Sequence, residues 1–554
     1  MGSPTDRRWL GEASARLLRS GTVRQLLLGA GAAACAAVVL WSAPASAQGD
    51  EMNFGVEEAG EVKDVSPVGQ FIEEGVKAYD AKQYRQASIL FYKVLEEPDI
   101  SADKFRAKAL YELAKTLYRL ELYQGALSYF YQIVDAGVEH PYYEATLSWL
   151  VLLARKLPGE GEILARVGQF AELFPNRVPD KFRSEMAFLL GKYFYNEADL
   201  DRALEYLKQV DPNSEQFAEA KFLEGICWVR KYEAKPAAAA FKRILAYVSD
   251  KDLSDPKLRN IEQLTLLSMG RTFYSVGQYD QAVKYYDFIP QNSPFWLDAL
   301  FEKSWSYFQL DNFNRSLGNL HTLNAPFFDD EYFPESMILQ SVVFFTNCRY
   351  DRVRLTIEEF ELIYPPLKEQ LQETLNQYQD PTELYEFLVK INRGEIEFDP
   401  RLNQILDAAL TDKTLKRKIE YMDELDRELE AISKSEASWR DSPVGKRLFE
   451  DLTVTRSFAL SDAGGLAQSR MERVVRELAD LVKQGKKILV ETAKAETNAL
   501  DQQIRDEQFQ GTDGSQGVKD VPVDEEHIYW SFQGEYWRDE LGYYLYNITS
   551  KCGR

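Results

Sequence analysis

Small and aromatic residues recur at fixed offsets along this chain, and the stretch GRTFYSVGQYDQAVKYYDFI at 270–289 shows the pattern most clearly. Relative to Ala282, Phe273 lies nine residues before, Gly270 twelve before and Tyr286 four after. Small residues at this spacing let two antiparallel helices cross closely, while the aromatic rings fill the space beside the crossing. Comparable sets surround Ala87, Ala126, Ala203, Ala237, Ser316 and Val353, with a degenerate unit at Trp149.

The recurrence predicts a stack of helix pairs, because one pair cannot bury its apolar face alone. The anchors from Ala203 to Ser316 lie 34, 45 and 34 positions apart. This pattern resembles the tetratricopeptide repeat, a unit of about 34 residues built from two antiparallel helices. The resemblance covers residues 68–366, about eight units, and implies an all-α superhelical solenoid.

The resemblance also implies that the first helix of each pair lines a concave face. Its outward positions would lie three before and one, four and five after the small residue of that helix. In this chain these positions hold aromatic and cationic residues: Tyr111, Lys115, Tyr118, Arg119, Phe188, Lys192, Tyr195, Phe222, Arg230, Arg271, Tyr274, Phe301, Trp305 and Phe308. We expect a groove for a peptide with apolar anchors and some negative charge. The alternative is that the aromatic residues pack between neighbouring first helices, with only the cations exposed.

Composition narrows the function classes. The chain of 554 residues is 45% hydrophobic, which excludes wholesale disorder, and its formal net charge of -22 argues against nucleic acid or an anionic membrane surface as the partner. It contains no phosphate-binding glycine loop and no G-x-S-x-G elbow, and its three histidines have no metal-ligand spacing. We therefore expect a non-enzymatic protein without catalytic residues, metal or cofactor.

The amino terminus predicts export. Several arginines precede the apolar run 26–41, and an A-x-A cleavage pattern follows at 45–47. We expect a signal peptide over residues 1–47, an acidic linker over 48–67 and a periplasmic location. The alternatives are an uncleaved membrane anchor, twin-arginine targeting through residues 7–8, and lipid attachment at Cys35.

The remaining cysteines fit neither a zinc site nor a disulfide framework. Cys227 and Cys348 lie in apolar helical contexts and are predicted to be buried thiols. Cys552, close to the carboxyl terminus, is the expected position for any intermolecular bridge.

Beyond residue 366 the repeat pattern stops. We expect a transition segment over 367–400 and a helical region over 401–505, in which a second, longer helix begins after Gly464 and Gly465. That helix carries an apolar series with alternating steps of three and four: Met471, Val474, Leu478, Leu481, Gly485, Ile488, Thr492, Ala495 and Ala499. An antiparallel hairpin packed on the solenoid is favoured over a dimerising coiled coil.

The carboxyl terminus combines an acidic, glycine-containing linker, 506–526, with an aromatic-rich tail, 527–554. So many aromatic residues have to be covered. The favoured interpretation is that the tail folds back on the protein, and the alternative is that it docks into a partner.

The layout of signal, repeats, helical region and aromatic end resembles the tetratricopeptide proteins of adventurous gliding motility. That resemblance implies an adaptor or scaffold that links envelope proteins through the groove and the tail. The alternative is a chaperone-like receptor for outer-membrane protein clients, similar to the tetratricopeptide lipoproteins of outer-membrane assembly.

Overall fold

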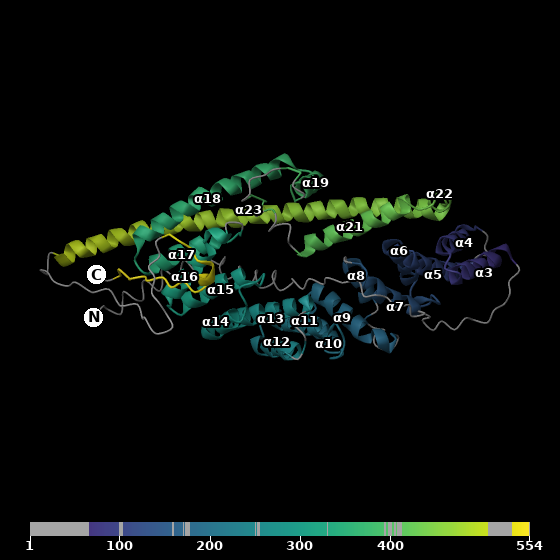
Figure 1. Cartoon of the computed structure of the whole chain (residues 1–554), viewed down its shortest axis with the longest axis horizontal. Helices are drawn as coiled ribbons and strands as arrows, with labels where there is room; N and C mark the ends of the chain where they lie inside the picture. The colour runs from purple at the N-terminus through teal and green to yellow at the C-terminus, as the bar shows by residue number, and fades with distance from the viewer. Residues whose placement is uncertain are drawn as a thin grey trace. The chain divides into compact units, whose positions relative to one another are not determined.

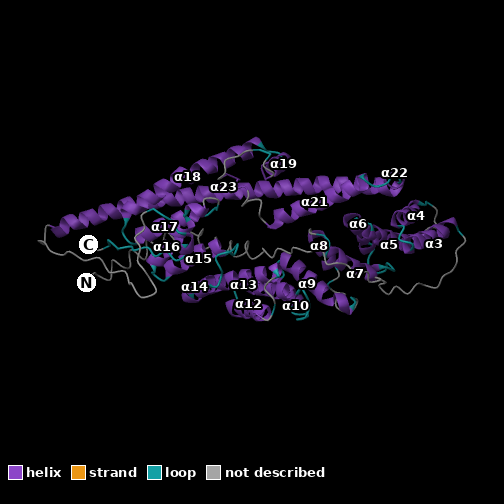
Figure 2. Ribbon diagram, viewed as in Figure 1, coloured by secondary structure: helices purple, strands orange, loops and turns teal. Residues whose placement is uncertain are grey.

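The protein is described here by a computed structural model covering residues 66–98, 103–157, 160–169, 171, 178–249, 251, 255–328, 331–392, 395–396, 402–403, 406, 413–507 and 534–552. Throughout these ranges the regular elements are helices and no strand occurs, so the all-α prediction is confirmed (Figure 2). The predicted signal peptide at 1–47 lies outside the described residues. So do nearly all residues of the predicted linkers at 48–67 and 506–526.

The described residues form two compact units. The first unit contains residues up to 261 together with 413–466, and the second contains 262–406 together with 467–552. Among the described helices, none is long and apolar enough to span a bilayer.

Eight successive helix pairs occupy residues 67–377 of the described chain (Figure 1). In each pair we call the first helix A and the second helix B. The pairs are α3 (Pro67–Asp80) and α4 (Tyr84–Glu96), α5 (Asp103–Arg119) and α6 (Tyr123–Asp135), α7 (Tyr143–Ala154) and α8 (Glu160–Gly168), α9 (Asp180–Asn196) and α10 (Leu200–Leu207), α11 (Phe217–Arg230) and α12 (Ala234–Ser249), α13 (Pro256–Ser275) and α14 (Tyr279–Asp287), α15 (Trp296–Gln309) and α16 (Phe313–Leu323), and α17 (Pro334–Thr346) and α18 (Tyr350–Gln377).

Each pair is held by the close crossing that the small residues permit. A Cβ atom added at Gly225 would lie closer than 3.0 Å to the ring of Phe241, and one at Gly270 would meet the ring of Tyr286 in the same way. The helix B anchors are equally enclosed, since Ala237 and Ala282 are both 0% exposed. The rings of helix B therefore pack directly on the glycines of helix A, which is the arrangement that the spacing predicts.

In seven of the eight pairs, all except α7 and α8, the turn between helix A and helix B shows one residue in the left-handed region. Gly277 has φ 75° there, whereas Ala198 has φ 59° and Asp311 has φ 57°. The same position in the other turns that show it is occupied by Lys82, Glu121, Tyr232 and Cys348. Since this conformation costs an L-residue roughly 1–2 kcal/mol, the tight turn is kept despite local strain in every one of these pairs except that of Gly277.

Helices α21 (Lys413–Ser433) and α23 (Pro443–Glu507) are antiparallel neighbours joined through the short helix α22 (Ala437–Arg440). Ion pairs link Lys418 to Asp462 at 3.1 Å and Arg456 to Asp426. The expectation that the long helix begins after Gly464 and Gly465 is wrong, because α23 runs through both glycines. The flanking Ala463 and Ala467 are buried at 0% and 1% exposure, so packing offsets the roughly 1 kcal/mol that each helical glycine costs.

In the first unit, the carboxyl-terminal helices pack on helices B of the first two pairs. Glu428 of α21 accepts hydrogen bonds from the backbone N–H groups of Gln124, at 2.6 Å, and Gly125, at 3.1 Å. These groups begin α6, which has no capping side chain of its own, so a residue some 300 positions away supplies the cap. Trp439 donates from its indole nitrogen to the hydroxyl of Ser88 on α4 at 2.8 Å.

In the second unit, α23 packs on α18. Leu481 and Ile488 share a core with Ile357, and Arg354 pairs with Glu496 at 2.6 Å. The predicted apolar series of α23 is thus largely covered within its own chain, as the packed arrangement requires and a dimerising seam does not.

The expected end of the solenoid at residue 366 falls inside a helix. Helix α18 continues through Pro365 and Pro366 to Gln377, because Leu367 and Leu371 beyond the prolines are buried and hold the helix in place. Helix α19 (Pro381–Asn392) occupies part of the predicted transition segment.

Replacing Ala198 with glycine should raise the free energy of unfolding by about 0.5–1 kcal/mol, because glycine adopts the left-handed turn without a steric penalty. The converse change Gly277→Ala should lower it by a similar amount. Urea unfolding followed by circular dichroism measures both. As a control, Ala239→Gly in the interior of α12 should destabilise by roughly 0.5–1 kcal/mol, and a loss of stability in Ala198→Gly would contradict the turn assignment.

Candidate partner-binding surface

Several aromatic residues predicted to line a groove in the first unit are buried instead. Tyr111, Phe188 and Phe222 are 4%, 7% and 1% exposed. Tyr111 stacks on Tyr142 with ring centroids 4.5 Å apart, and its hydroxyl accepts a hydrogen bond from the indole nitrogen of Trp149 at 3.0 Å. These rings join adjacent repeats, as the alternative interpretation of the pattern proposed.

Tyr118 and Tyr195 of the same unit are only partly covered. Tyr118 meets Trp149 edge to face at 5.1 Å, and Tyr195 lies beneath the guanidinium group of Arg230. Both side chains are thus partly exposed and could border a contact.

The second unit repeats this division. Trp305 and Phe308 are buried at 8% and 7% exposure, while Tyr274 and Phe301 are partly covered. Burial raises the pKa of the Tyr274 hydroxyl, and its ring meets Tyr279 edge to face at 5.2 Å. The structure therefore does not bring the fourteen predicted residues together as one open set, and they are divided between the two units.

Cations on helix A reach back to aromatic residues of the preceding repeat. Arg230 lies 4.7 Å from the ring centroid of Tyr195 and donates to its backbone carbonyl at 3.2 Å. Arg119 donates in the same manner to the hydroxyl of Tyr79 at 3.2 Å. Both arginines follow the small residue of their helix by five positions, so this contact is a repeated link between neighbouring repeats.

The two lysines are held by local partners. Lys115 pairs with Glu112 at 2.9 Å and is 17% exposed, whereas Lys192 lies 5.1 Å above the ring of Phe188 and is partly exposed. Among the predicted groove cations, Arg230 is exposed, whereas Lys192 and Arg119 are partly exposed.

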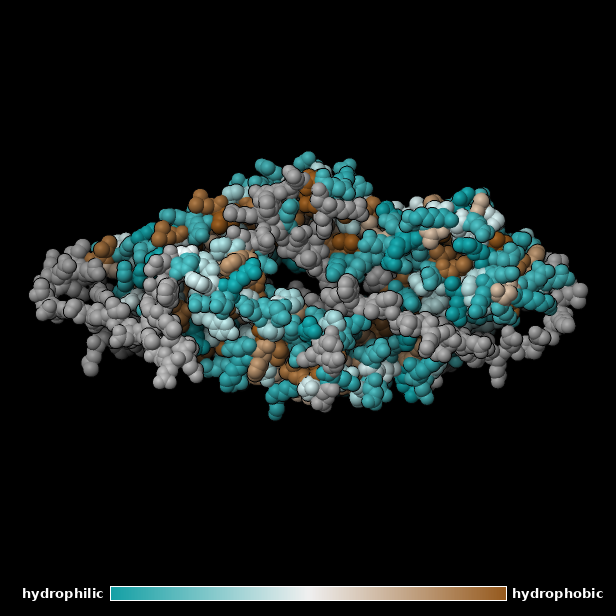
Figure 3. All heavy atoms as spheres, in the orientation of Figure 1, coloured by the Kyte–Doolittle hydropathy of each residue, from teal (hydrophilic) through white to brown (hydrophobic). Residues whose placement is uncertain are grey.

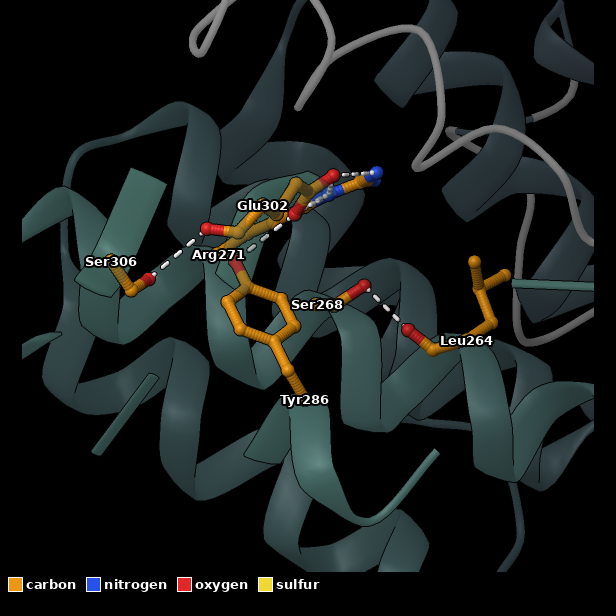
Figure 4. A network of polar contacts seen from close by, with 6 residues as sticks. All are labelled: Leu264, Ser268, Arg271, Tyr286, Glu302 and Ser306. Carbon is orange, nitrogen blue, oxygen red and sulfur yellow. Dashed lines mark hydrogen bonds and ion pairs between the residues drawn. The ribbon is translucent and has the colours of Figure 1, made fainter. Parts of the chain in front are cut away.

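Arg271 is part of a buried network and is not available as a surface cation (Figure 4). Its guanidinium group pairs with Glu302 at 2.5 Å, and the two side chains are 14% and 11% exposed. The hydroxyl of Tyr286 donates to the same carboxylate at 3.0 Å. Glu302 lies one repeat after Arg271, and this spacing was the signal in the sequence that could have identified the pair.

The network includes one carboxyl group with an altered acidity. The pKa of Asp298 is raised to about 6, chiefly because the carboxyl group is buried. The positive charge of Arg271 opposes this rise, and the negative charges of Glu302 and Glu331 add to it. The network therefore joins two helices A, α13 and α15, through charges that are shielded from water.

The carboxyl-terminal residues 534–552, here called the strap, fold back on the second unit. The backbone N–H of Tyr546 donates to the carbonyl of Asn314 at 3.1 Å, and that of Gly542 donates to the hydroxyl of Thr322 at 3.0 Å. A Cβ atom at Gly318 would collide with the carbonyl oxygen of Tyr544. The strap thus runs along α16, with its backbone in direct contact with that helix.

Side chains and a covalent bond complete this contact. Tyr536 stacks on His321 at 4.7 Å, and Cys552 forms a disulfide with Cys348. The predictions of a buried thiol at Cys348 and an intermolecular bridge at Cys552 are therefore wrong, since the left-handed turn before α18 brings Cys348 to the strap. Cys227 is a buried free thiol, as predicted.

Hydrophilic residues cover most of the surface in view, and hydrophobic residues appear as scattered patches between them (Figure 3). In the part of the chain that is described, no group of three or more histidine, cysteine or acidic residues could hold a metal ion.

Three pairs place a glycine of helix A beneath a ring of helix B, seven have a left-handed residue in the turn between the helices, and eight pairs follow one another within the described residues. This is the arrangement that the resemblance to the tetratricopeptide repeat implies. No model of a known protein family matches the sequence, and none of the curated proteins compared with it is similar.

Solved structures similar to this chain include a tetratricopeptide repeat protein from Parabacteroides merdae, at 13% identity and a TM-score of 0.25, covering 53% of this chain and 93% of the other. The apo form of RapI is 14% identical, with a TM-score of 0.33, and the match covers 60% of this chain and 100% of the other. The P58(IPK) TPR domain is 13% identical, with a TM-score of 0.18, and the match covers 70% of this chain and 98% of the other. TM-scores at this level do not establish a shared fold, so the description of the chain as successive helix pairs rests on its own geometry.

The raised pKa of Asp298 predicts a specific dependence of stability on pH. Between the ordinary aspartate pKa of 3.8 and the folded-state pKa of about 6, the folded protein binds this proton more tightly than the unfolded chain. The free energy of unfolding should therefore fall as the pH rises through this window, by up to roughly 2 kcal/mol, and Asp298→Asn should remove that fall. Urea unfolding at pH 4, 5, 6 and 7 tests this, with Asp501→Asn on the exposed end of α23 as control. An unchanged pH profile in Asp298→Asn would contradict the assignment.

Gly318→Ala should lift the strap from α16, because the new methyl group would occupy the position of the Tyr544 carbonyl oxygen. We expect the amides of Gly542 and Tyr546 to lose hydrogen-exchange protection by roughly ten-fold or more, with the disulfide intact. Gly465→Ala is the matched control, because no atom lies within 4 Å of its added Cβ. Unchanged protection in Gly318→Ala would show that the strap does not rest on this helix.

Proposed function

We propose that this protein is an exported, non-enzymatic tetratricopeptide adaptor that gathers proteins of the cell envelope. The observation that carries the proposal is the unequal use of the two kinds of helix in the first unit. There the chain's own carboxyl-terminal elements contact helices B of the first two pairs, through Glu428 and Trp439. In the second unit α23 and the strap contact helices of both kinds, since Tyr546 meets Phe344 of α17 as well as Asn314 of α16. Helices A of the first unit keep exposed or partly exposed cations, Lys192 and Arg230 among them.

The disulfide supports a location outside the cytoplasm. Bridges between distant residues persist in oxidising compartments such as the periplasm, and Cys348 and Cys552 are 204 residues apart. This agrees with the export signal expected from residues 1–47. Cleavage of that signal, which the sequence favours over an anchor, belongs to the same proposal.

An adaptor with fixed partners is preferred to a receptor for unfolded clients. A client receptor needs open apolar pockets for many different segments, but five of the aromatic residues that would form them are buried: Tyr111, Phe188, Phe222, Trp305 and Phe308. What remains is a surface of cations beside ring edges, which suits a defined acidic partner segment. The layout resemblance makes the gliding motility machinery the complex that we propose for this adaptor.

The charge of helix A is the feature to test. In cells treated with a reversible crosslinker, the protein should recover a small, constant set of envelope proteins. Replacing both Lys192 and Arg230 with glutamate should reduce that recovery by about ten-fold, because each of these cations lies on a helix A of the first unit, α9 and α11. Arg271 is unsuitable for this purpose, because its loss would leave Glu302 buried without its ion-pair partner.

The control is Lys242→Glu on α12, an exposed lysine of a helix B that should leave recovery unchanged. Thermal unfolding of all variants should agree within a few degrees. Recovery of many unrelated outer-membrane proteins would favour the receptor instead. If the double variant recovers the same proteins in the same amounts, the binding surface does not include these two cations.

A further inference from the structure

Helix α18 presents a stripe of exposed leucine that the described part of the chain does not cover. Leu355 is 57% exposed and Leu362 is 78% exposed, whereas Val353, Ile357 and Phe360 on the opposite side are fully buried. Seven residues separate the two leucines, so they lie on one side of the helix about 10 Å apart. An exposed leucine pair on the last helix of a repeat array is unusual, because terminal repeats ordinarily present a polar outer face.

Carboxylates border this stripe on both sides. At 100° per residue, Glu358 and Glu359 fall on opposite flanks of the line through Leu355 and Leu362, and both are exposed. Asp351 and Glu369 continue the acidic border toward the two ends of the stripe. The border is not purely acidic, since Arg352 is exposed on it and Asp351 pairs with Arg349 at 3.4 Å.

The backbone adds two further acceptors at the same place. Pro365 and Pro366 lie inside α18, and proline has no N–H group. The carbonyl oxygens of Glu361 and Leu362 therefore do not receive the hydrogen bond that residues four positions later normally donate. Next to the most exposed leucine, the helix offers carbonyl oxygens as well as carboxylates to a hydrogen-bond donor.

We propose that this face of α18 binds a basic amphipathic helix of a partner protein. The partner would lay an apolar line with a seven-residue spacing along Leu355 and Leu362, with lysine or arginine on both flanks facing Glu358 and Glu359. Cationic side chains would also reach the two carbonyl oxygens left open by the prolines. The surface deepens the proposed adaptor function and rests on it, since it names one class of partner.

A synthetic probe tests this with the full chain. The probe is a fluorescein-labelled helical peptide with leucines seven residues apart and lysines on both flanks, and its Kd is measured by anisotropy. The double variant Leu355→Ser and Leu362→Ser should weaken binding by about ten-fold or more, and Glu358→Gln with Glu359→Gln should weaken it and reduce its salt dependence. All four side chains are exposed, so these variants should keep the parental Tm.

Leu500→Ser is the matched control, because Leu500 is a leucine of similar exposure, 54%, on α23. A second control is a peptide of the same composition with its leucines and lysines shuffled, which reports the general attraction of an acidic protein for lysine. Equal Kd values for the parent and the leucine variants would overturn the proposal.

Analytical ultracentrifugation tests whether a second copy of this chain, and not a partner helix, occupies the stripe. A dimer that the leucine substitutions dissociate would assign the stripe to a second copy of this chain and would also overturn the proposal. Crosslinked recovery through Lys192 and Arg230 is an independent readout in the first unit. If the leucine variants bind the peptide as the parent does, while crosslinked recovery still depends on Lys192 and Arg230, the α18 surface is rejected and the adaptor function is retained.

Discussion

The close crossing of helix A and helix B is the contact on which the rest of the structure depends. It requires a residue without a large side chain on helix A, such as Gly225 or Gly270, and a large apolar side chain from helix B to cover it, which is a ring at these two glycines and Leu207 at Gly191. Because a side chain at the glycine would displace the ring, the pair loses both its crossing and its buried aromatic surface together. The offset between the two residues is thus fixed by geometry, and its recurrence makes the chain a solenoid.

A solenoid of this kind has two problems that the carboxyl-terminal third addresses. Its terminal repeats lack a neighbour on one side, and some of its short helices, α6 among them, begin without a capping side chain of their own. Glu428 supplies the missing cap of α6, and Leu481 and Ile488 cover the last pair. The long helix and the strap therefore act as parts of the fold, although the repeat pattern does not extend to them.

The sequence predicts the features that are set locally and misses those that are set at a distance. Eight helix pairs follow from offsets of a few residues, whereas the disulfide joins positions 204 residues apart. Gly464 and Gly465 have low helix propensity, yet the buried alanines on either side keep α23 continuous. For the groove, a ring on helix A can face either a ligand or the next repeat, and a single repeat does not distinguish them. Tyr111 and Trp305 are buried for that reason.

The arginines of helix A show how the same residue type separates into structural and surface roles. Arg271 has a carboxylate one repeat later, Glu302, and the two side chains become a shielded pair beneath Tyr286. Arg230 lies against the ring and carbonyl of Tyr195, and this leaves the guanidinium group exposed. A shielded ion pair satisfies both charges and leaves little for a partner, whereas a cation resting on a ring keeps donors free to face solvent. The residue that meets an arginine one repeat away therefore decides whether that arginine stabilises the array or remains available for recognition.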